Sequence, residues 1–358
     1  MADKLGVAVI GCGYWGVNYV RLFHELPDAN LIAVCEMDAS RRDQIANRFP
    51  EARLCASLDE ICALEGIDAV VVATPATTHY EVARQCLEAG KHVLVEKPLA
   101  TTSREVEALH QLAEARHLKL MVGHIFQYNA GVQLVRQTIQ EGHIGRIYYL
   151  DSQRTNLGPF RSDVNVIWDL ATHDVSIFNH LLQSSPEWVS AVGSRVLREN
   201  CCEDVAFLVL SYPGNILGHI HVSWANPNKE REISVIGSEG RIVFNDLNTL
   251  EPVRIFEKSV SMVKNEPSSF GEYKFAIRDG AIISPKVPIS EPLRNQCLHF
   301  IECIQHDLTP ITDALSGLHV VRVMEAADRS IELNGMPVAL NYERENGYQP
   351  VLESSSIR

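Results

Sequence analysis

The first third of the chain alternates apolar runs with segments whose apolar residues recur at helical spacing. The apolar runs predict five strands: GVAVIG, LIAVCE, DAVVVAT, HVLVE and KLMVG. Helical spacing predicts helices at 14–26, 41–49, 78–89 and 103–117. Continuous Val/Ile/Leu strands that alternate with helices are typical of a parallel sheet covered on both faces. We therefore predict an α/β domain over residues 1–123, with the doubly wound parallel sheet of a Rossmann fold.

Residues 124–358 follow a different pattern, which predicts a second, α+β domain. Short strands joined by turns such as Pro213-Gly214-Asn215 indicate a mostly antiparallel sheet. The predicted strands are IYYLDSQRT, WVSAVGSRV, VAFLVLSY, ILGHIHVSW, EISVIGS and GRIVFND. The predicted helices are 132–140, 166–182, 292–305 and 314–333. The stretch 258–292 has no clear periodicity and is predicted to be a long loop.

Composition narrows the class of partner and the compartment. Hydrophobic residues make up 46% of the 358 residues, and the formal net charge is -13 with no basic block. Nucleic acid and anionic membranes are therefore not expected as partners. No run is long enough to span a bilayer, and the apolar strand near the start leaves no room for a signal peptide. The nine cysteines lack metal-ligand spacing, so we expect reduced thiols and a cytoplasmic protein.

A glycine-rich segment between the first strand and the first helix predicts a dinucleotide site. It reads Gly11-Cys12-Gly13-Tyr14-Trp15-Gly16. In this pattern the first glycine permits a tight turn, the second lets the backbone approach a pyrophosphate, and the third allows close helix–strand packing. The helix N-terminus then supplies N–H groups for the phosphates. We expect all of these residues except Cys12 to contact the cofactor.

The adenosine side of this site carries an acidic residue. Glu36 ends the second strand, twenty residues after Gly16. A carboxylate there accepts hydrogen bonds from ribose hydroxyls and repels a 2′-phosphate, which favours NAD over NADP. Arg41 and Arg42 follow closely and keep NADP open as an alternative. Further cofactor contacts are expected from Thr74, Pro75 and His79, because they follow the third strand at the ligand-binding edge of the sheet.

Two clusters have side chains suited to oxidising an alcohol. Glu96-Lys97-Pro98 follows the fourth strand, so Glu96 and Lys97 are expected at the cofactor, where Lys97 can stabilise negative charge on a substrate oxygen. Asp169 and His173 are spaced i, i+4 on a helix, so Asp169 can orient His173 as a general base. No metal is required, because a hydride acceptor and a base complete the oxidation.

These motifs, in this order, resemble the Gfo/Idh/MocA oxidoreductase family over nearly the whole chain. The resemblance rests on GCGYWG, Glu36, ATPATTHYEVA, AGKHVLVEKPLA, MVGHIFQYN, the DxxxH of Asp169 and His173, and the helix 314–335. It implies that Lys97 and His173 carry catalysis and that Asp169 orients His173. It also implies a large open sheet in the second domain, whose outer face commonly forms the interface of a homodimer or homotetramer.

One departure points to a branch of this family. Many members that act on free sugars or inositols have Arg where this chain has Gln127. The segments DSQRTNLGPFRSDVNVIWDLATHD and HIHVSWANPNKERE are similar to UDP-N-acetylglucosamine 3-dehydrogenases, which belong to nucleotide-sugar and surface-polysaccharide biosynthesis. The resemblance implies a UDP-sugar substrate. Candidate substrate contacts are Arg154 and Arg161 for a diphosphate and Tyr128, Asn156 and Asn165 for the sugar.

Three alternatives remain from the sequence. The protein is a dehydrogenase of a free sugar or inositol, or it reduces a nucleotide-linked ketosugar. A third alternative, from another class, is a non-catalytic NAD-responsive binding protein. Intact Lys97 and His173 argue against that last alternative, because a sensor requires neither.

Overall fold

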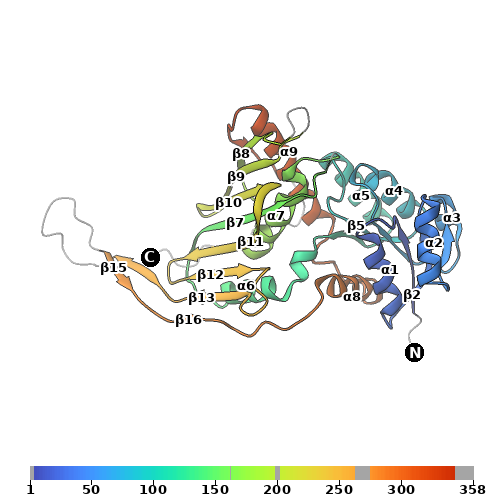
Figure 1. Cartoon of the computed structure of the whole chain (residues 1–358), viewed down its shortest axis with the longest axis horizontal. Helices are drawn as coiled ribbons and strands as arrows, with labels where there is room; N and C mark the ends of the chain where they lie inside the picture. Colours follow the sequence, from blue (N-terminus) through green and yellow to red (C-terminus); the bar gives the residue numbers. More distant parts are fainter. Residues whose placement is uncertain (1–3, 162, 198–201, 263–274, 343–358) are drawn as a thin grey trace, which may run out of the picture. The chain divides into compact units, whose positions relative to one another are not determined.

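The computed structural model describes residues 4–161, 163–197, 202–262 and 275–342. The chain forms two compact units (Figure 1). The first contains the residues up to Tyr128 together with Ser290–Glu325, and the second contains Asn129–Ile289 and the residues from Ala326 onward. Each unit is described in turn.

The first unit is built on a six-stranded parallel sheet in the order β3-β2-β1-β4-β5-β6. The strands are β1 (Leu5–Ile10), β2 (Ala29–Cys35), β3 (Arg53–Cys55), β4 (Ala69–Val72), β5 (His92–Glu96) and β6 (Leu120–Gly123). This order reverses direction between β1 and β4, as in a Rossmann fold, and it confirms the predicted doubly wound sheet. The short edge strand β3 was not predicted, because three residues carry too little periodicity.

Four of the five helices that connect the strands lie close to where the sequence predicts them, and the short helix Leu58–Ala63 was not predicted. They are α1 (Gly16–Glu25), α2 (Ala39–Arg48), α3 (Leu58–Ala63), α4 (His79–Glu88) and α5 (Ser103–Ala115). Their starts have local causes: Thr102 and Glu105 form a capping box at α5, and Asp38 accepts a hydrogen bond from the Arg41 N–H at α2. No described helix is both long and apolar enough to cross a membrane.

Helix α8 (Pro292–Gln305) joins this first unit, although it lies far along the sequence. Its buried residues Leu293, Cys297 and Phe300 belong to the same hydrophobic core as Tyr19 and Phe23 of α1. The compact units therefore differ from the predicted division into 1–123 and 124–358. Burial of an apolar helix face decides where α8 packs, and chain order does not.

The second unit contains a nine-stranded sheet in the order β16-β13-β12-β11-β7-β10-β9-β8-β17. Its strands are β7 (Ile147–Leu157), β8 (Trp188–Ser194), β9 (Val205–Tyr212), β10 (Ile216–Ser223), β11 (Ala225–Gly237), β12 (Arg241–Asn245), β13 (Val253–Phe256), β16 (Ile282–Ile283) and β17 (Val338–Ala339). Among these pairs only β10 and β7 are parallel. The sheet is therefore mixed and mostly antiparallel, as predicted.

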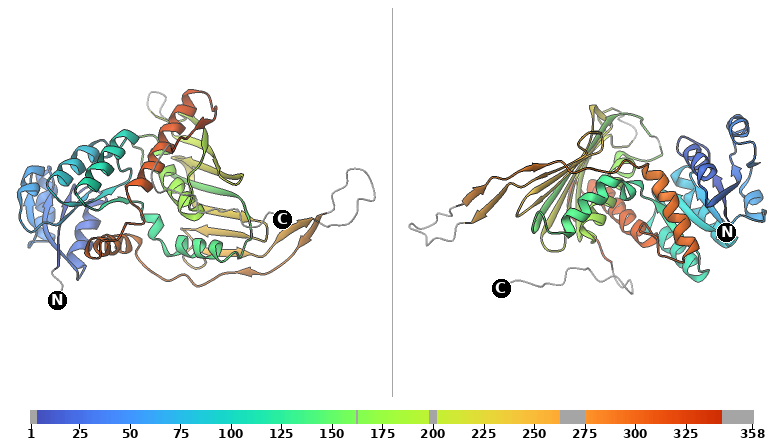
Figure 2. Two further views of the ribbon diagram at one scale, coloured as in Figure 1. Left: turned by 180° about the vertical axis from the view of Figure 1, so that it is seen from behind. Right: turned by 90° about the horizontal axis from the view of Figure 1, so that it is seen from below.

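Helices α6 (Ala130–Gln140) and α7 (Thr172–Leu182) lie on one face of this sheet (Figures 1 and 2). The division between the units falls within the last long helix, α9 (Ala314–Glu332). The predicted loop at 258–292 is only partly correct. It contains a hairpin of β14 (Ser259–Met262) and β15 (Phe275–Arg278), which extends away from the large sheet, and the edge strand β16. Residues 263–274 lie outside the described part.

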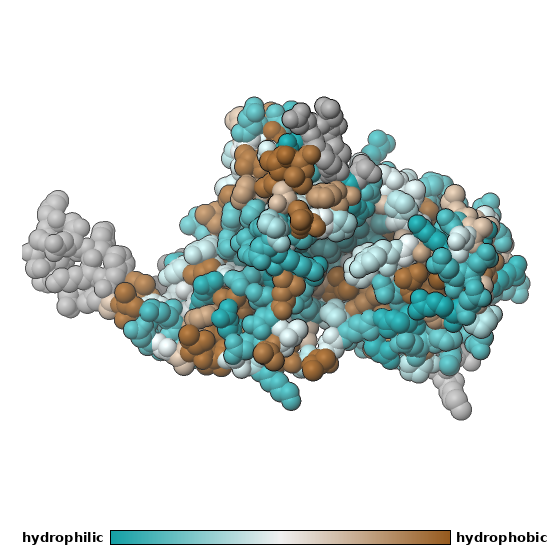
Figure 3. All heavy atoms as spheres, in the orientation of Figure 1, coloured by the Kyte–Doolittle hydropathy of each residue, from teal (hydrophilic) through white to brown (hydrophobic). Residues whose placement is uncertain are grey.

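The other face of the nine-stranded sheet carries exposed apolar side chains. Val192, Phe207, Leu217 and Tyr149 come from four neighbouring strands, and all are more than 40% exposed. Figure 3 shows brown hydrophobic spheres gathered where Figure 1 places β8 and β9. Large exposed apolar patches typically mark interaction surfaces, so this face is available to a partner.

Candidate active site

The glycine loop after β1 has the conformation that its sequence predicts. Gly11 has a φ of 88°, and a Cβ on it would lie 2.9 Å from the backbone of Ala73. A Cβ on Gly16 would lie 1.9 Å from the carbonyl oxygen of Gly11, so both positions exclude larger residues. A Cβ on Gly13 would meet no atom within 4 Å. This open space fits the close approach of a pyrophosphate, and Tyr14 and Trp15 beside it are exposed.

Glu36 is buried and lies directly against the glycine loop. Its Oε2 accepts a hydrogen bond from the Cys12 N–H at 2.7 Å, and its Oε1 accepts one from the Asp38 N–H at 3.0 Å. Nη1 of Arg41 lies 4.0 Å from Oε2, on a mostly exposed side chain. Arg42 instead donates to the carbonyl oxygen of Glu36 at 2.6 Å. The structure thus brings together the glycine loop, the acidic residue and one arginine with an exposed side chain.

The loops after β4 and β5 are joined by a buried histidine. The His79 ring places Nδ1 2.7 Å from the carbonyl oxygen of Pro98 and Nε2 2.9 Å from that of Thr74. The hydroxyl of Thr78 lies 2.8 Å from both the Thr74 hydroxyl and the Pro75 carbonyl oxygen. Both ring nitrogens thus face backbone carbonyls and the residue is 1% exposed, while a contact of His79 with the cofactor stays a prediction. Its role is to hold two loops of the edge together.

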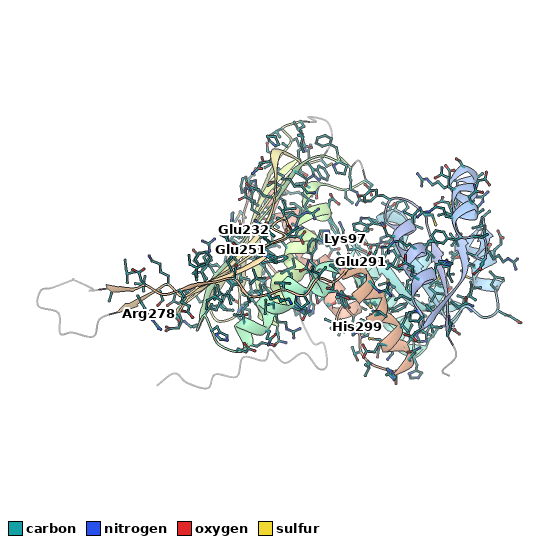
Figure 4. All side chains as sticks on the ribbon, turned by 60° about the horizontal axis from the view of Figure 1, so that its bottom comes forward. Lys97, Glu232, Glu251, Arg278, Glu291 and His299 are labelled. Atoms are coloured by element: carbon teal, nitrogen blue, oxygen red, sulfur yellow. The ribbon has the colours of Figure 1, made fainter. Side chains whose placement is uncertain are left out.

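Lys97, labelled in Figure 4, follows β5 and has its backbone held by its neighbour. Oε2 of Glu96 accepts a hydrogen bond from the Lys97 N–H at 3.1 Å, and Oε1 accepts one from the Tyr19 hydroxyl at 2.6 Å. Both oxygens of the Glu96 carboxylate thus accept hydrogen bonds from the protein, and a contact of Glu96 with the cofactor stays a prediction.

His124 follows β6 and was not among the predicted site residues. It is 2% exposed, and burial lowers its pKa to about 3, with the nearby charge of Lys97 as a second cause. An isolated histidine after a strand gives no distinguishing signal in the sequence. Its position becomes evident only when β5 and β6 are paired.

In the second unit, the predicted DxxxH pair lies at a change of helix type. Ile167–Ala171 forms a π-helical turn that runs directly into α7, so Asp169 lies in the π turn and His173 in the first turn of α7. Oδ1 of Asp169 accepts from Arg161 Nη1 at 3.2 Å, and Oδ2 accepts from the indole N–H of Trp224 at 3.2 Å. Such π turns occur frequently at functional sites.

A second carboxylate anchors the start of this helical segment. Asp328 of α9 accepts hydrogen bonds from Asn165 Nδ2 at 2.8 Å and from the Trp168 indole N–H at 2.6 Å. Oδ1 of Asn165 accepts from the backbone N–H groups of Ile167 and Trp168, both at 3.1 Å. The Asn165 amide thus caps the helix on one side and binds Asp328 on the other, and a contact with the sugar stays a prediction.

Two further predicted substrate residues are buried. Arg154 lies within β7, where its Nε and Nη2 each donate to Asp174 at 2.9 Å and only 4% of the residue is exposed. Tyr128 has its hydroxyl 3.1 Å from that of Thr312. These polar groups pair within the protein, and their contacts with a substrate stay predictions.

Arg161 and Asn156 remain partly exposed. Arg161 binds Asp163 through Nε at 2.9 Å and Nη2 at 2.6 Å, and it also reaches Asp169. The Asn156 amide donates to the carbonyl oxygen of Gly158. No three His, Cys, Asp or Glu side chains in the described part of the chain are grouped to hold a metal ion.

Comparison with known proteins identifies the family. Residues 5–124 match the oxidoreductase family with an NAD-binding Rossmann fold, and residues 132–243 match the Gfo/Idh/MocA C-terminal domain. The chain belongs to the Gfo/Idh/MocA oxidoreductase family. As a member, it is an oxidoreductase with an NAD-binding Rossmann domain, and the fit of the glycine loop to a dinucleotide agrees with this.

The enzymes to which the chain is similar include dehydrogenases named for different substrates. A scyllo-inositol 2-dehydrogenase (NAD(+)) of Bacillus subtilis is 26% identical over 96% of this chain and 98% of the relative. A UDP-N-acetylglucosamine 3-dehydrogenase of Acidithiobacillus ferrooxidans is 32% identical, over 57% of this chain and 62% of the relative. The crystal structure of GenD2 from gentamicin A biosynthesis, in complex with NAD, superposes with a TM-score of 0.80 at 25% identity, over 95% of this chain and 97% of that one.

Proposed function

We propose that this protein oxidises a secondary hydroxyl of a sugar to a ketone, with NAD as the cofactor and C3 of UDP-N-acetylglucosamine as the site of reaction. The observation that carries the proposal is the arrangement around Asp169. Its carboxylate is held by Arg161 and Trp224 one helical turn before His173. A histidine preceded by a fixed carboxylate is suited to accept a proton, because the carboxylate stabilises the charged imidazolium.

His173 and Lys97 have complementary roles in this proposal. His173 accepts the hydroxyl proton, and the Lys97 ammonium stabilises the negative charge that develops on the same oxygen. Lys97 belongs to the first unit and His173 to the second. Bound NAD supplies the hydride acceptor at its nicotinamide ring. Gly11, Gly13, Gly16, Tyr14 and Trp15 hold the pyrophosphate side, while Glu36, Thr74 and Pro75 complete the cofactor contacts.

The assignment of a UDP-linked substrate is supported by the relative that acts on UDP-N-acetylglucosamine and by Arg161. A planar guanidinium suits a diphosphate, because it donates two parallel hydrogen bonds. Arg161 is partly exposed, and Asp163 occupies its Nε and Nη2. A diphosphate would therefore take the place of Asp163 on the guanidinium. Tyr128, Asn156 and Asn165 are the candidates for the sugar, and Asn156 is partly exposed.

A second candidate function is oxidation of a free inositol. It is favoured by the inositol dehydrogenase that aligns over 96% of this chain. Gln127 argues for the UDP-sugar, since many members that act on free polyols have Arg there. Formation of NADH from NAD with UDP-N-acetylglucosamine, other UDP-sugars, myo-inositol and scyllo-inositol separates the two candidates. Turnover of inositols alone would refute the UDP-sugar assignment, and binding of NAD without turnover of any substrate would favour a sensor.

The face of the nine-stranded sheet that carries the exposed apolar side chains is here called the open face. We propose that it joins two copies of the chain in a homodimer, or in a homotetramer built from such dimers. The support is the apolar surface on four adjacent strands that includes Phe207 and Leu217. Flanking polar groups include the His219 ring, 2.6 Å from Asp151. Burial of such a surface against its own copy is a common route to a symmetric dimer.

A further inference from the structure

A chain of three hydrogen-bonded side chains, two of them buried and Glu96 half-buried, lies behind Lys97 and links three elements of the first unit. Gln296 of α8 donates from Nε2 to the Tyr19 hydroxyl at 2.8 Å. Tyr19 of α1 donates in turn to Oε1 of Glu96 at 2.6 Å. Oε2 of Glu96, at the end of β5, accepts from the Lys97 N–H at 3.1 Å. Gln296 and Tyr19 are both fully buried, so water does not compete for the hydrogen bond between them.

The ionisable neighbours leave Lys97 as the charged partner of Glu96. Burial raises the pKa of Tyr19 on α1 and the pKa of Cys297 on α8 well above their usual values, so both stay protonated and neutral. Burial lowers the pKa of His124, after β6, to about 3, so this imidazole is neutral as well. A carboxylate in these surroundings needs strong hydrogen bonds and a nearby cation to remain ionised.

Opposing effects act on Glu96 itself. Burial raises its pKa, and the hydrogen bond from Tyr19, the charge of Lys97 and the N–H of Lys97 each lower it. The short bond from a phenol to a carboxylate is of the charge-assisted kind, which is roughly twice as strong as a neutral bond. Gln296 reinforces it, because a phenol that accepts a hydrogen bond becomes a better donor.

We propose that Tyr19 and Gln296 are positioning residues for Lys97, because their hydrogen bonds hold the Glu96 carboxylate, which in turn fixes the Lys97 backbone. Helix α8, which is distant in sequence, thereby supports the residue after β5. This chain of hydrogen bonds from Gln296 through Tyr19 and Glu96 to Lys97 is called the relay below. Its importance for catalysis rests on the proposed function of Lys97. The relay itself is tested without any substrate.

Tyr19→Phe removes only the hydroxyl and keeps the ring that packs in the core. Without the phenol, the pKa of Glu96 rises further in the folded protein. A carboxyl whose folded pKa exceeds its unfolded pKa costs stability as the pH rises between the two values, because the unfolded chain ionises more easily. The loss caused by Tyr19→Phe is therefore smallest at acidic pH and largest near and above neutral pH.

Thermal denaturation across about pH 5 to about pH 8 tests this sign. We expect Tyr19→Phe to lower the melting temperature more at the upper end of the range, by roughly 2–4 °C or more beyond its effect at the lower end. Tyr212→Phe is the matched control, because Tyr212 is also buried and donates to a neutral partner, Asn179, at 2.9 Å. The decrease in melting temperature caused by Tyr212→Phe should not change with pH. A decrease in melting temperature for Tyr19→Phe that is likewise independent of pH would overturn the proposal.

Kinetics test the positioning role once a substrate is known. For Tyr19→Phe we expect kcat to fall at acidic pH and recover as the pH rises, with the KM for NAD nearly unchanged. The recovery should disappear in the Tyr19→Phe/Glu96→Gln double variant, which has no carboxylate to ionise. A kcat equal to that of the unmodified protein at every pH would refute the role in positioning. If no substrate is found at all, the proposed function fails, while the denaturation experiment still decides whether the relay exists.

Discussion

Glu36 accepts a hydrogen bond from the Cys12 N–H at 2.7 Å, so the residue expected to bind the adenosine ribose also fixes the glycine loop. The two roles are compatible, because a carboxylate offers about four acceptor sites. Oε1 is further bound by the Asp38 N–H. Substitutions at Glu36 will therefore change both the shape of the loop and the recognition of the ribose, and the two effects must be separated by experiment.

We expect NAD to bind at least tenfold more tightly than NADP, which corresponds to about 1.4 kcal/mol. The reason is that Glu36 accepts from a ribose hydroxyl and repels a 2′-phosphate. Glu36→Gln keeps an oxygen that can accept the hydrogen bond from the glycine loop and removes the negative charge. It should therefore reduce the difference in affinity between NAD and NADP. Titration of both cofactors against each variant measures this difference.

Arg41→Ala is the matched control for the cofactor preference. Arg41 has the exposed guanidinium near Glu36, 4.0 Å from Oε2. Loss of the Arg41 guanidinium should weaken the binding of NADP more than that of NAD, because this guanidinium is the cation nearest to the expected 2′-phosphate. Equal affinities for the two cofactors in the unmodified protein would contradict the role of Glu36.

Lys97→Ala and His173→Ala should each reduce turnover by about a hundredfold or more, since loss of general acid–base assistance typically costs 10²–10⁴. NAD binding should persist in both variants, because the glycine loop is untouched. Initial rates and cofactor titrations provide the two measurements. Near-normal turnover of His173→Ala between about pH 6 and about pH 9 would show that His173 has a structural role.

Arg154→Met should destabilise the protein without a selective effect on substrate binding. It leaves Asp174 buried without its guanidinium partner, and such a change costs about 3–5 kcal/mol. In the double variant Arg154→Met/Asp174→Leu the uncompensated charge is gone, so part of the stability should return. Denaturant unfolding measures both. A raised KM for a UDP-sugar with unchanged stability would instead support the original prediction that Arg154 binds a diphosphate.

The fold and the glycine loop were predictable because their signals are local. Strand-length apolar runs, helical spacing and GxGxxG each lie within a few residues of the feature they predict. The protein partners of the candidate substrate residues were not, because these contacts depend on pairing between distant segments. Arg154 meets Asp174 only through the packing of β7 against α7, and Asn165 meets Asp328 only through α9. An arginine or asparagine in sequence does not reveal a buried partner.

Phe207→Asp should reduce self-association if the open sheet face joins two copies. The substitution places a charge at the centre of the apolar surface, where Phe207 stacks on His221 with ring centroids 4.4 Å apart. Light scattering on the purified protein should then show a smaller particle than for the unmodified chain. Leu250→Asp is the control, because Leu250 is 91% exposed and lies outside the strands. A monomeric unmodified protein would remove the basis of the proposal.

Arg161 permits the sharpest test of the substrate class, because its guanidinium is partly exposed and also binds Asp169. If it binds a diphosphate, UDP alone should compete with the substrate, and Arg161→Ala should raise the KM for a UDP-sugar far more than that for any free sugar. Because Nη1 also donates to Asp169 at 3.2 Å, kcat should fall as well.

Asp163→Asn separates the effect on substrate binding from the effect on Asp169. It weakens the ion pair that competes for the Arg161 guanidinium, while the contact of Arg161 with Asp169 remains. The KM for a UDP-sugar should therefore decrease, and kcat should change little. Inhibition by UDP and the kinetics of both variants form one experiment. If UDP does not compete and Arg161→Ala lowers only kcat, Arg161 acts solely through Asp169, and the free-polyol function becomes the better supported one.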